Sequence, residues 1–181
     1  MIPIQFQTVN GLTVLLRPAR VEDQSKIIEN IGLVLAEKVF LQTDQFVLTP
    51  GWIKAFAASC DPHQGSLLLV PEIDGQLVGH LRVHPGEYGA KDRHVASLGI
   101  VLINGYRVMG IGKAMLKAAV EWCDRAGYEK MEVSVLSTNQ HAIHLFEQFG
   151  FQIVGVLKRQ LKIGPDYVDE LIMDRMVTAT G

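Results

Sequence analysis

Two glycines, Gly110 and Gly112, stand in the segment YRVMGIGKAML (residues 106–116) where an apolar helical pattern begins. Arg107 and Lys113 flank them with positive charge. The first turn of a helix has backbone N–H groups without intrahelical partners, and the helix dipole favours an anion there. Glycines allow a tight turn and leave no Cβ in the path of a bulky anion. The segment therefore predicts a phosphate cradle, and the alternative is a glycine turn that binds nothing.

The two best-known phosphate motifs do not fit this segment. The pattern GxxxxGK[ST] requires a glycine at the position of Arg107. The dinucleotide pattern GxGxxG requires a third glycine, where this chain has Met115. A different phosphate ligand is therefore expected.

The elements that must position this turn follow from the spacing of apolar residues. The strand before it, HVASLGIVLI, is apolar on both faces and is therefore expected at the centre of a sheet. Asp74-Gly75 predicts a hairpin turn. We expect strands at residues 12–19, 66–73, 76–84, 94–103, 131–136, 151–163 and 167–177, and helices at 21–38, 50–59, 111–126 and 139–149. This order predicts a mixed α/β sheet that is covered by helices on both faces.

Length and composition indicate one domain, residues 1–181, with 48% hydrophobic and 20% charged residues. The net charge of −2 argues against a broad nucleic-acid surface. No apolar run reaches the length of a membrane span, and no secretory signal is expected. Cys60 and Cys123 form no recognisable motif, so we expect free thiols in the cytoplasm.

Two segments together resemble the Gcn5-related N-acetyltransferase (GNAT) family. Arg107-x-x-Gly110-x-Gly112 is similar to the (Q/R)-x-x-G-x-(G/A) signature, and it lies between the central strand and its helix as in the family. The family's later N-x-x-A-x-x-L-Y-x-x-x-G-F segment resembles Asn139, Ala142, Leu145, Phe146 and FGF at 149–151. The ending YVDELIM is similar to that of bacterial members that acetylate amino acids, peptides or small amines. The resemblance implies the GNAT fold, a mostly antiparallel sheet in which two central parallel strands splay apart.

The resemblance implies acetyl-CoA as co-substrate. Backbone N–H groups of the glycine turn would hold its pyrophosphate, and Ile100 and Leu102 would pair with the pantetheine arm between the splayed strands. Asn139 would contact the arm from the other side, cap the following helix, or do both. Lys113 would bind phosphate or remain a solvated charge. The implied cofactor-binding residues are Ile100, Leu102, Arg107, Val108, Met109, Gly110, Ile111, Gly112, Lys113, Asn139 and Phe146.

Two positions depart from the family pattern. Ser97 stands where many members have a carboxylate on the central strand, and serine is a poor base. Phe146 stands where the family usually has the tyrosine that protonates the leaving sulfur, and phenylalanine has no proton to donate. The candidate catalytic residues are Ser97, Glu132 and Ser137, and His94, Asp169 and Glu170 are further candidates for the base.

We therefore expect transfer of the acetyl group to a primary amine, chiefly the α-amine of an amino acid or peptide or another small amine. An α-amine costs only about 1.4 kcal/mol to deprotonate at pH 7, whereas a lysine side chain costs about 4 to 5 kcal/mol. The alternatives are a non-catalytic acyl-CoA-binding or sensor domain of the same fold, or a structural domain with an empty glycine turn. A homodimer is possible by family analogy.

Several other groups are interpreted more simply. The histidine pairs His80/His84 and His141/His144 lack a third ligand at useful spacing, so no metal is expected. Three aromatic residues could line an acceptor pocket or pack in the core: Phe40, Phe46 and Trp52. Three basic residues could contact a nucleotide phosphate but are better explained as a solvated strand edge: Lys158, Arg159 and Lys162.

Overall fold

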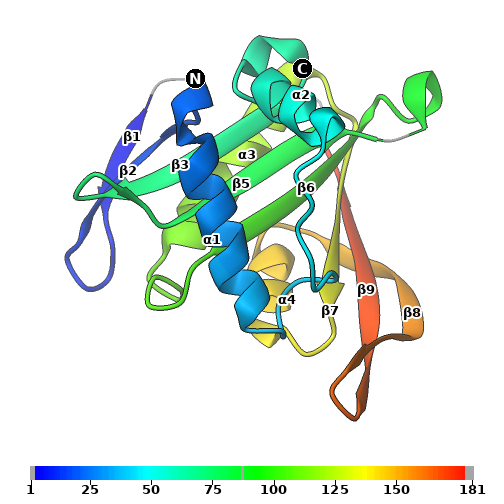
Figure 1. Ribbon diagram of the computed structural model, residues 1–181. Helices are drawn as coiled ribbons and strands as arrows, with labels where there is room; N and C mark the ends of the chain where they lie inside the picture. Colours follow the sequence, from blue (N-terminus) through cyan, green and yellow to red (C-terminus); the bar gives the residue numbers. More distant parts are fainter. Residues whose placement is uncertain (1–2, 87, 178–181) are drawn as a thin grey trace.

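The computed structural model describes residues 3–86 and 88–177, and these form one sheet with helices on both faces (Figure 1). The strands are β1 (Ile4–Gln7), β2 (Thr13–Pro18), β3 (Leu67–Ile73), β4 (Gln76–Leu77), β5 (Gly79–Pro85), β6 (Val95–Leu102), β7 (Lys130–Leu136), β8 (Gln152–Ile163) and β9 (Asp166–Met176). The α-helices are α1 (Gln24–Ala36), α2 (Pro50–Ser59), α3 (Ile111–Ala126) and α4 (Gln140–Gln148). Short 3₁₀ turns cover Val21–Asp23, Pro62–Gln64 and Gly89–Lys91.

The strand order is β1-β2-β3-β5-β6-β7-β9-β8, with β4 paired to β3. Among the described strands only β6 and β7 run parallel, and every other pair is antiparallel. The predicted mixed, mostly antiparallel sheet is therefore confirmed. The hairpin turn is also confirmed, because Asp74 and Gly75 both have positive φ, of 49° and 78°.

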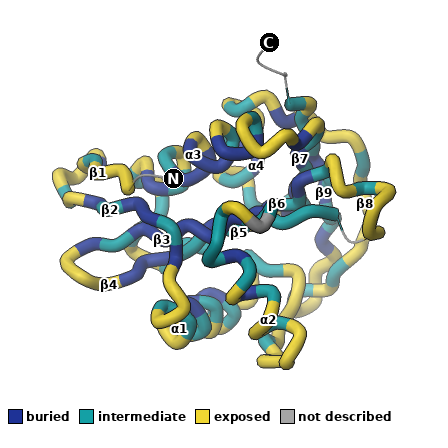
Figure 2. Tube along the Cα trace, turned by 90° about the horizontal axis from the view of Figure 1, so that it is seen from above, coloured by how far each residue is buried: buried dark blue, intermediate teal, exposed yellow. Residues whose placement is uncertain are grey.

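The two faces of the sheet are covered by different helix pairs. Figure 2 shows α1 and α2 on one side of the sheet and α3 and α4 on the other. The predicted apolar stripe of α3 is buried against the sheet, and Gly127 ends the helix with a φ of 81°. The larger core cluster joins α3 and α4 to the sheet, and the smaller one joins α1 and α2 to its other face.

The sequence prediction missed one strand and overestimated one helix. β1 pairs with β2 at the edge of the sheet and has only four residues, IQFQ, so its pattern is short. The helix expected at residues 21–38 begins with a 3₁₀ turn, and α1 ends at Ala36. Residues 37–49 then cross in front of the sheet to reach α2, a path that is visible in Figure 1.

Candidate active site

The central parallel strands are paired only at one end. Residues 95–97 of β6 pair with residues 130–132 of β7, and the remaining residues of the two strands pair only with β5 and β9. On the side where β6 and β7 face each other, the backbone of residues 98–102 and 133–136 therefore has no strand partner. The splay that the family resemblance implied is present.

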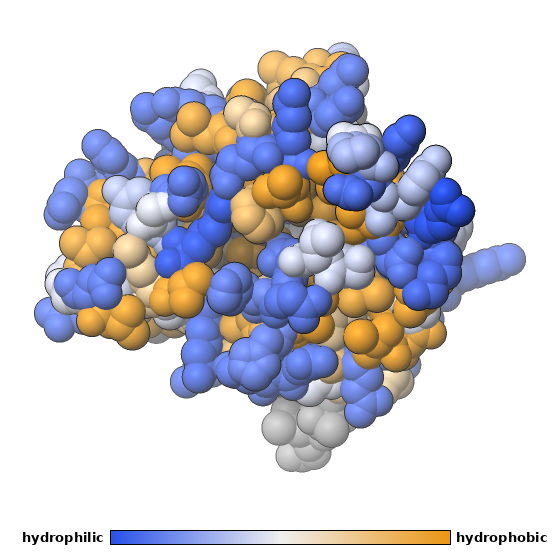
Figure 3. Space-filling view, turned by 90° about the horizontal axis from the view of Figure 1, so that it is seen from below, coloured by the Kyte–Doolittle hydropathy of each residue, from blue (hydrophilic) through white to orange (hydrophobic). Residues whose placement is uncertain are grey.

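A cavity of about 480 Å³ occupies this splay. It is bounded by β6, β7, the glycine turn, α4, the end of α1 and the segment that follows α1. Viewed from below, the molecule has a hollow with apolar atoms in its depth and hydrophilic atoms around it (Figure 3). The residues that line the cavity include Phe40, Gln42, Gly99, Ile100, Leu102, Arg107, Val108, Gly110, Gly112, Lys113, Ser134, Asn139 and Phe146.

The N-terminus of α3 opens into this cavity without a cap from the protein. Gly110 is the N-cap residue, with a φ of 89°, and no side chain bonds to the first turn. Within residues 3–86 and 88–177, the amides of residues 108–112 donate no hydrogen bond to the protein. Val108 has a φ of 59°, a left-handed conformation that is strained for a β-branched residue. The turn therefore offers free amides to an anion.

Arg107 lines the cavity, and its guanidinium is bonded to other groups of the protein. It donates to both carboxylate oxygens of Glu37, at 2.7 and 2.6 Å, and to the carbonyl oxygen of Leu102 at 2.7 Å. It also lies over the ring of Phe40, 4.2 Å from its centroid. The guanidinium hydrogen bonds lower the pKa of the Glu37 carboxyl. Arg107 thus ties the end of α1 to the glycine turn.

The other predicted cofactor contacts line the same cavity. Lys113 lies there and has no carboxylate partner among the residues that the structure describes. Asn139 lies there too, and its side-chain oxygen accepts the amide of Ala142 at 3.2 Å, so it caps α4 as predicted. Phe146 is 3% exposed and packs edge-on against Phe151. Its phenyl ring has no proton to donate to a leaving thiolate.

The three candidate catalytic residues lie outside the cavity lining. Ser97 and Glu132 face each other across the last paired position of β6 and β7. Glu132 is 3.9 Å from Lys130, and 40% of its side chain is exposed. Ser137 follows β7, and its amide donates to the carbonyl oxygen of Asp169. The splay thus begins just beyond Ser97 and Glu132.

Sequence reasoning missed Ser134, which lines the cavity. Its hydroxyl donates to the carboxylate of Glu170 on β9, and its carbonyl oxygen accepts the side-chain amide of Gln42 at 3.1 Å. Strand alternation could have pointed to it, because Ser134 is two residues beyond Glu132 on the same face of β7. Of the other candidate bases, Asp169 pairs with Lys158 at 2.8 Å and lies outside the lining.

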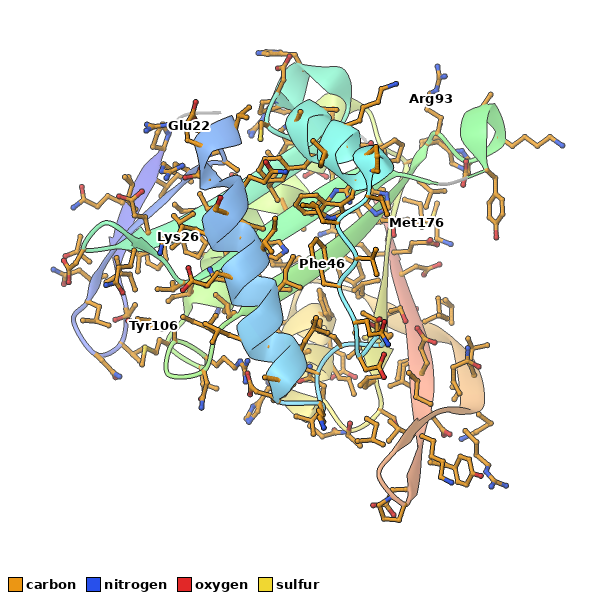
Figure 4. The ribbon with its side chains drawn as sticks, in the orientation of Figure 1. Glu22, Lys26, Phe46, Arg93, Tyr106 and Met176 are labelled. Carbon is orange, nitrogen blue, oxygen red and sulfur yellow. The ribbon has the colours of Figure 1, made fainter. Side chains whose placement is uncertain are left out.

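The aromatic residues divide between the site and the core. Phe40 lines the cavity, whereas Trp52 stacks on Phe56 and meets Phe46 edge-on, with ring centroids 5.3 and 5.1 Å apart. Figure 4 labels Phe46 on the segment between α1 and α2. Only the first of the three predicted pocket residues is therefore at the site.

Residues 36–151 match the acetyltransferase (GNAT) family. The chain belongs to this family. It is 31% identical over 109 residues to the L-amino acid N-acetyltransferase AaaT of Escherichia coli (strain K12), which covers 60% of this chain and 67% of that protein. It is 32% identical over 107 residues to an N-alpha-acetyltransferase of Sulfurisphaera tokodaii, which covers 54% of this chain. The chain spans 63% of that archaeal relative's length.

Solved structures support the same fold for this GNAT chain. A GNAT-family acetyltransferase from Streptococcus pneumoniae has a TM-score of 0.81 at 24% identity, over 91% of this chain and 99% of that one. A phosphinothricin acetyltransferase from Sinorhizobium meliloti in complex with acetyl-CoA has a TM-score of 0.82 at 22% identity, over 93% and 92% of the two chains. The predicted GNAT fold is therefore confirmed.

The described residues include neither a helix that could span a membrane nor a cluster of metal-binding side chains. None of their helices is both long and apolar enough to cross a bilayer. No cluster of three or more histidine, cysteine or acidic side chains that could hold a metal ion occurs among them. His80 is buried, which lowers the pKa of its imidazole to about 4.

Proposed function

We propose that this GNAT protein transfers the acetyl group of acetyl-CoA to a primary amine, the α-amine of an amino acid or peptide or another small amine. One observation carries the proposal: the unpaired inner edges of β6 and β7 and the uncapped N-terminus of α3 meet in a single cavity. An extended chain with a diphosphate at one end fits such a space, because the strand edges can bond its amides and the helix can bond its phosphates.

The residues that would hold acetyl-CoA follow from this fit. The amides of residues 107–112 would receive the pyrophosphate, and Lys113 would add a positive charge beside it. The backbones of Ile100 and Leu102 would pair with the pantetheine arm, and Asn139 and Phe146 would contact it from the α4 side. When bound, acetyl-CoA supplies an activated acetyl group on a thiolate leaving group.

The surroundings of the cavity favour an acceptor amine that loses its proton easily. Among the described residues that line the cavity there is no carboxylate that could act directly as a strong base. An α-amine, with a pKa near 8, needs only about 1.4 kcal/mol for deprotonation at pH 7. The names of the two relatives, an L-amino acid N-acetyltransferase and an N-alpha-acetyltransferase, agree with such an acceptor.

Phe146 stands at the position where the family usually has a tyrosine that protonates the leaving sulfur, so the thiol would leave without that acid. A thiol of pKa about 8.5 leaves as thiolate for only about 2 kcal/mol near neutrality, so a missing acid slows the reaction without stopping it. Ser97, Glu132 and Ser137 are candidates for proton transfer, and because they lie outside the lining they would act through water.

An amine panel with release of free CoA as the readout tests the proposal. The panel contains amino acids, short peptides, polyamines and aminoglycosides, together with an Nα-blocked peptide that carries one lysine. We expect turnover with α-amines or small amines. Binding of acetyl-CoA without turnover of any amine would favour the non-catalytic acyl-CoA-binding domain, and activity on the lysine side chain alone would contradict the proposed acceptor.

We also propose a homodimer that forms through β8. This strand is the edge of the sheet, and it exposes apolar side chains along its first half: Ile153, Val154, Val156 and Leu157. An apolar edge strand of this length favours association. Light scattering of the wild type and of Val156→Lys tests the proposal: we expect a dimer that the substitution weakens, and a wild-type monomer would contradict it.

A cytoplasmic location is proposed from the two cysteines. Both are free, and burial raises the thiol pKa to about 11 for Cys60 and to about 12 for Cys123. Fractionation of cells that express the protein would test the location.

A further inference from the structure

The narrow end of the splay is framed by Gly99 on β6 and Ser134 on β7. The last paired residues are Ser97 and Glu132, and the next residues on the same faces of these parallel strands are Gly99 and Ser134. Both line the cavity, and a Cβ at Gly99 would meet no atom within 4 Å. The glycine turn lies at the wide end, so a pantetheine arm that starts there ends near this glycine and serine.

The hydroxyl of Ser134 is held in place by its neighbours. It donates to Oε1 of Glu170, which lies on β9 next to β7. The side-chain amide of Gln42 donates to the carbonyl oxygen of Ser134 at 3.1 Å and, at the longer distance of 3.4 Å, to its hydroxyl oxygen, which has a second lone pair for another donor. A serine hydroxyl that donates to a carboxylate can still accept from an N–H group. Ser134 therefore presents an acceptor to the cavity with a carboxylate behind it.

Among the residues that the structure describes, three carboxylates contact side chains that line the cavity, and two of these are poorly placed to take a proton. Glu37 already receives two hydrogen bonds from a guanidinium. Glu147 is 3.9 Å from His144 on the exposed side of α4, with about half of its own side chain exposed. Glu170 accepts a hydrogen bond from the hydroxyl of Ser134 at the narrow end of the splay. It has no cationic partner among the residues that the structure describes.

Resting on the acetyl transfer proposed above, we infer that Ser134 and Glu170 form the route by which the acceptor amine loses its proton. The ammonium donates a proton to the hydroxyl oxygen of Ser134 while the serine proton passes to Glu170, which leaves a neutral amine. The amine nitrogen forms its bond to the acetyl carbon as the carbon–sulfur bond breaks. The second nitrogen proton goes to the departing thiolate, and Glu170 returns its own proton to water. Ser134 is the catalytic residue here, and Glu170 acts through it.

Steady-state kinetics with two groups of amines test this route. One group has pKa values well above the assay pH, and the other, such as trifluoroethylamine and related weak bases, has pKa values below it. With the first group, we expect Glu170→Gln and Ser134→Ala each to lower kcat/KM on the order of 100-fold. The double variant should be no worse than either single variant. With the second group, whose amines are already neutral, the loss should shrink to about threefold or less.

The controls separate this route from a structural role and from failure of the proposed function. Ser134→Thr keeps a hydroxyl and should restore most of the activity, and Asp166→Asn removes an exposed carboxylate from β9 and should behave as wild type. Binding of acetyl-CoA should be retained in every variant. Three outcomes would overturn the route while leaving acetyl transfer intact. They are an equal loss of kcat/KM for both amine groups, wild-type activity in Glu170→Gln, and a loss that depends on the amine pKa in Glu132→Gln instead of Glu170→Gln. A wild type that turns over no amine would refute the proposed function and the route with it.

Discussion

The helices α3 and α4 begin at the same cavity, but only the N-terminus of α4 is capped by the side chain of its N-cap residue. At α4 the side chain of Asn139 accepts the amide of Ala142 at 3.2 Å, so the protein caps its own helix. At α3 the N-cap residue is Gly110, which has no side chain, and no other side chain in residues 3–86 or 88–177 bonds to the first turn. Both positions line the cavity. A cap such as that of α4 contributes about 1 kcal/mol to stability.

At the N-terminus of α3 the fold gives up stability in favour of binding. The uncapped turn also holds Val108 in a strained left-handed conformation and places two glycines at a helix start. Each of these features is unfavourable for the folded chain alone. Together they leave a row of free amides beside the splayed strands, which is what a diphosphate group requires. Four substitutions test this difference between the two helix N-termini.

The largest expected effect comes from a carboxylate placed inside the open N-terminus. Gly112→Asp puts a negative charge at the second residue of α3, where it occupies and repels the anion site, and we expect acetyl-CoA to bind at least about 100-fold more weakly. Gly51→Asp is the matched control, because Gly51 is the second residue of α2, whose N-terminus Thr49 already caps. Calorimetric titration should show wild-type affinity for the control. Equal affinities in both variants would contradict the cradle.

Arg107→Gln removes the link between the open turn and α1. The variant loses two hydrogen bonds to Glu37, one to the carbonyl oxygen of Leu102 and the contact with Phe40, so we expect a loss of about 2 kcal/mol in the free energy of unfolding. The affinity for acetyl-CoA should fall less than about tenfold, because Glu37 already neutralises this guanidinium. Chemical denaturation and titration measure the two quantities. A 100-fold loss of affinity with unchanged stability would show that the guanidinium binds phosphate directly.

At the capped N-terminus, Asn139→Ala should cost about 1 kcal/mol of unfolding free energy, because the amide of Ala142 loses its side-chain acceptor and keeps only the carbonyl oxygen of residue 139. Asn139→Ser keeps an oxygen that can cap the helix, so its stability should be close to wild type. If the amide of Asn139 also contacts the pantetheine arm, both variants should bind acetyl-CoA more weakly to a similar degree. Wild-type stability in the alanine variant would refute the capping role.

The smallest effect is expected at Val108. Its φ of 59° is unfavourable for valine and easy for glycine, so Val108→Gly should stabilise the protein by up to about 1 kcal/mol in urea unfolding. The Val120→Gly variant supplies the comparison, because the same replacement within α3 should destabilise. A destabilised Val108→Gly protein would mean that the conformation is not strained.

The sequence predicted the elements near the site well, because their signals are local. The glycine turn, the apolar stripe of α3, its end at Gly127 and the cap of α4 by Asn139 each depend on a few neighbouring residues. The family resemblance, carried by two short motifs, supplied the splay of β6 and β7. β1 was missed because its alternation of apolar and polar residues, IQFQ, extends over only four residues.

The side-chain partners at the site could not be predicted in the same way. Glu37 and Arg107 are 70 residues apart in the sequence, and no sequence pattern around either residue predicts that they form an ion pair. Ser134 and Glu170 meet only because β9 lies beside β7, which depends on the strand order. The sequence identified carboxylates as candidate bases, but only the fold determines which of them lies behind a residue of the cavity.

Hydrogen exchange of the individual backbone amides tests the open cradle most directly, with the free protein compared with the protein saturated with acetyl-CoA. We expect the amides of residues 108–112 to exchange rapidly in the free protein and to be strongly protected in the complex, while the amide of Ala142 is protected in both. Protection of residues 108–112 before acetyl-CoA is added, or no gain of protection there on binding, would refute the open cradle.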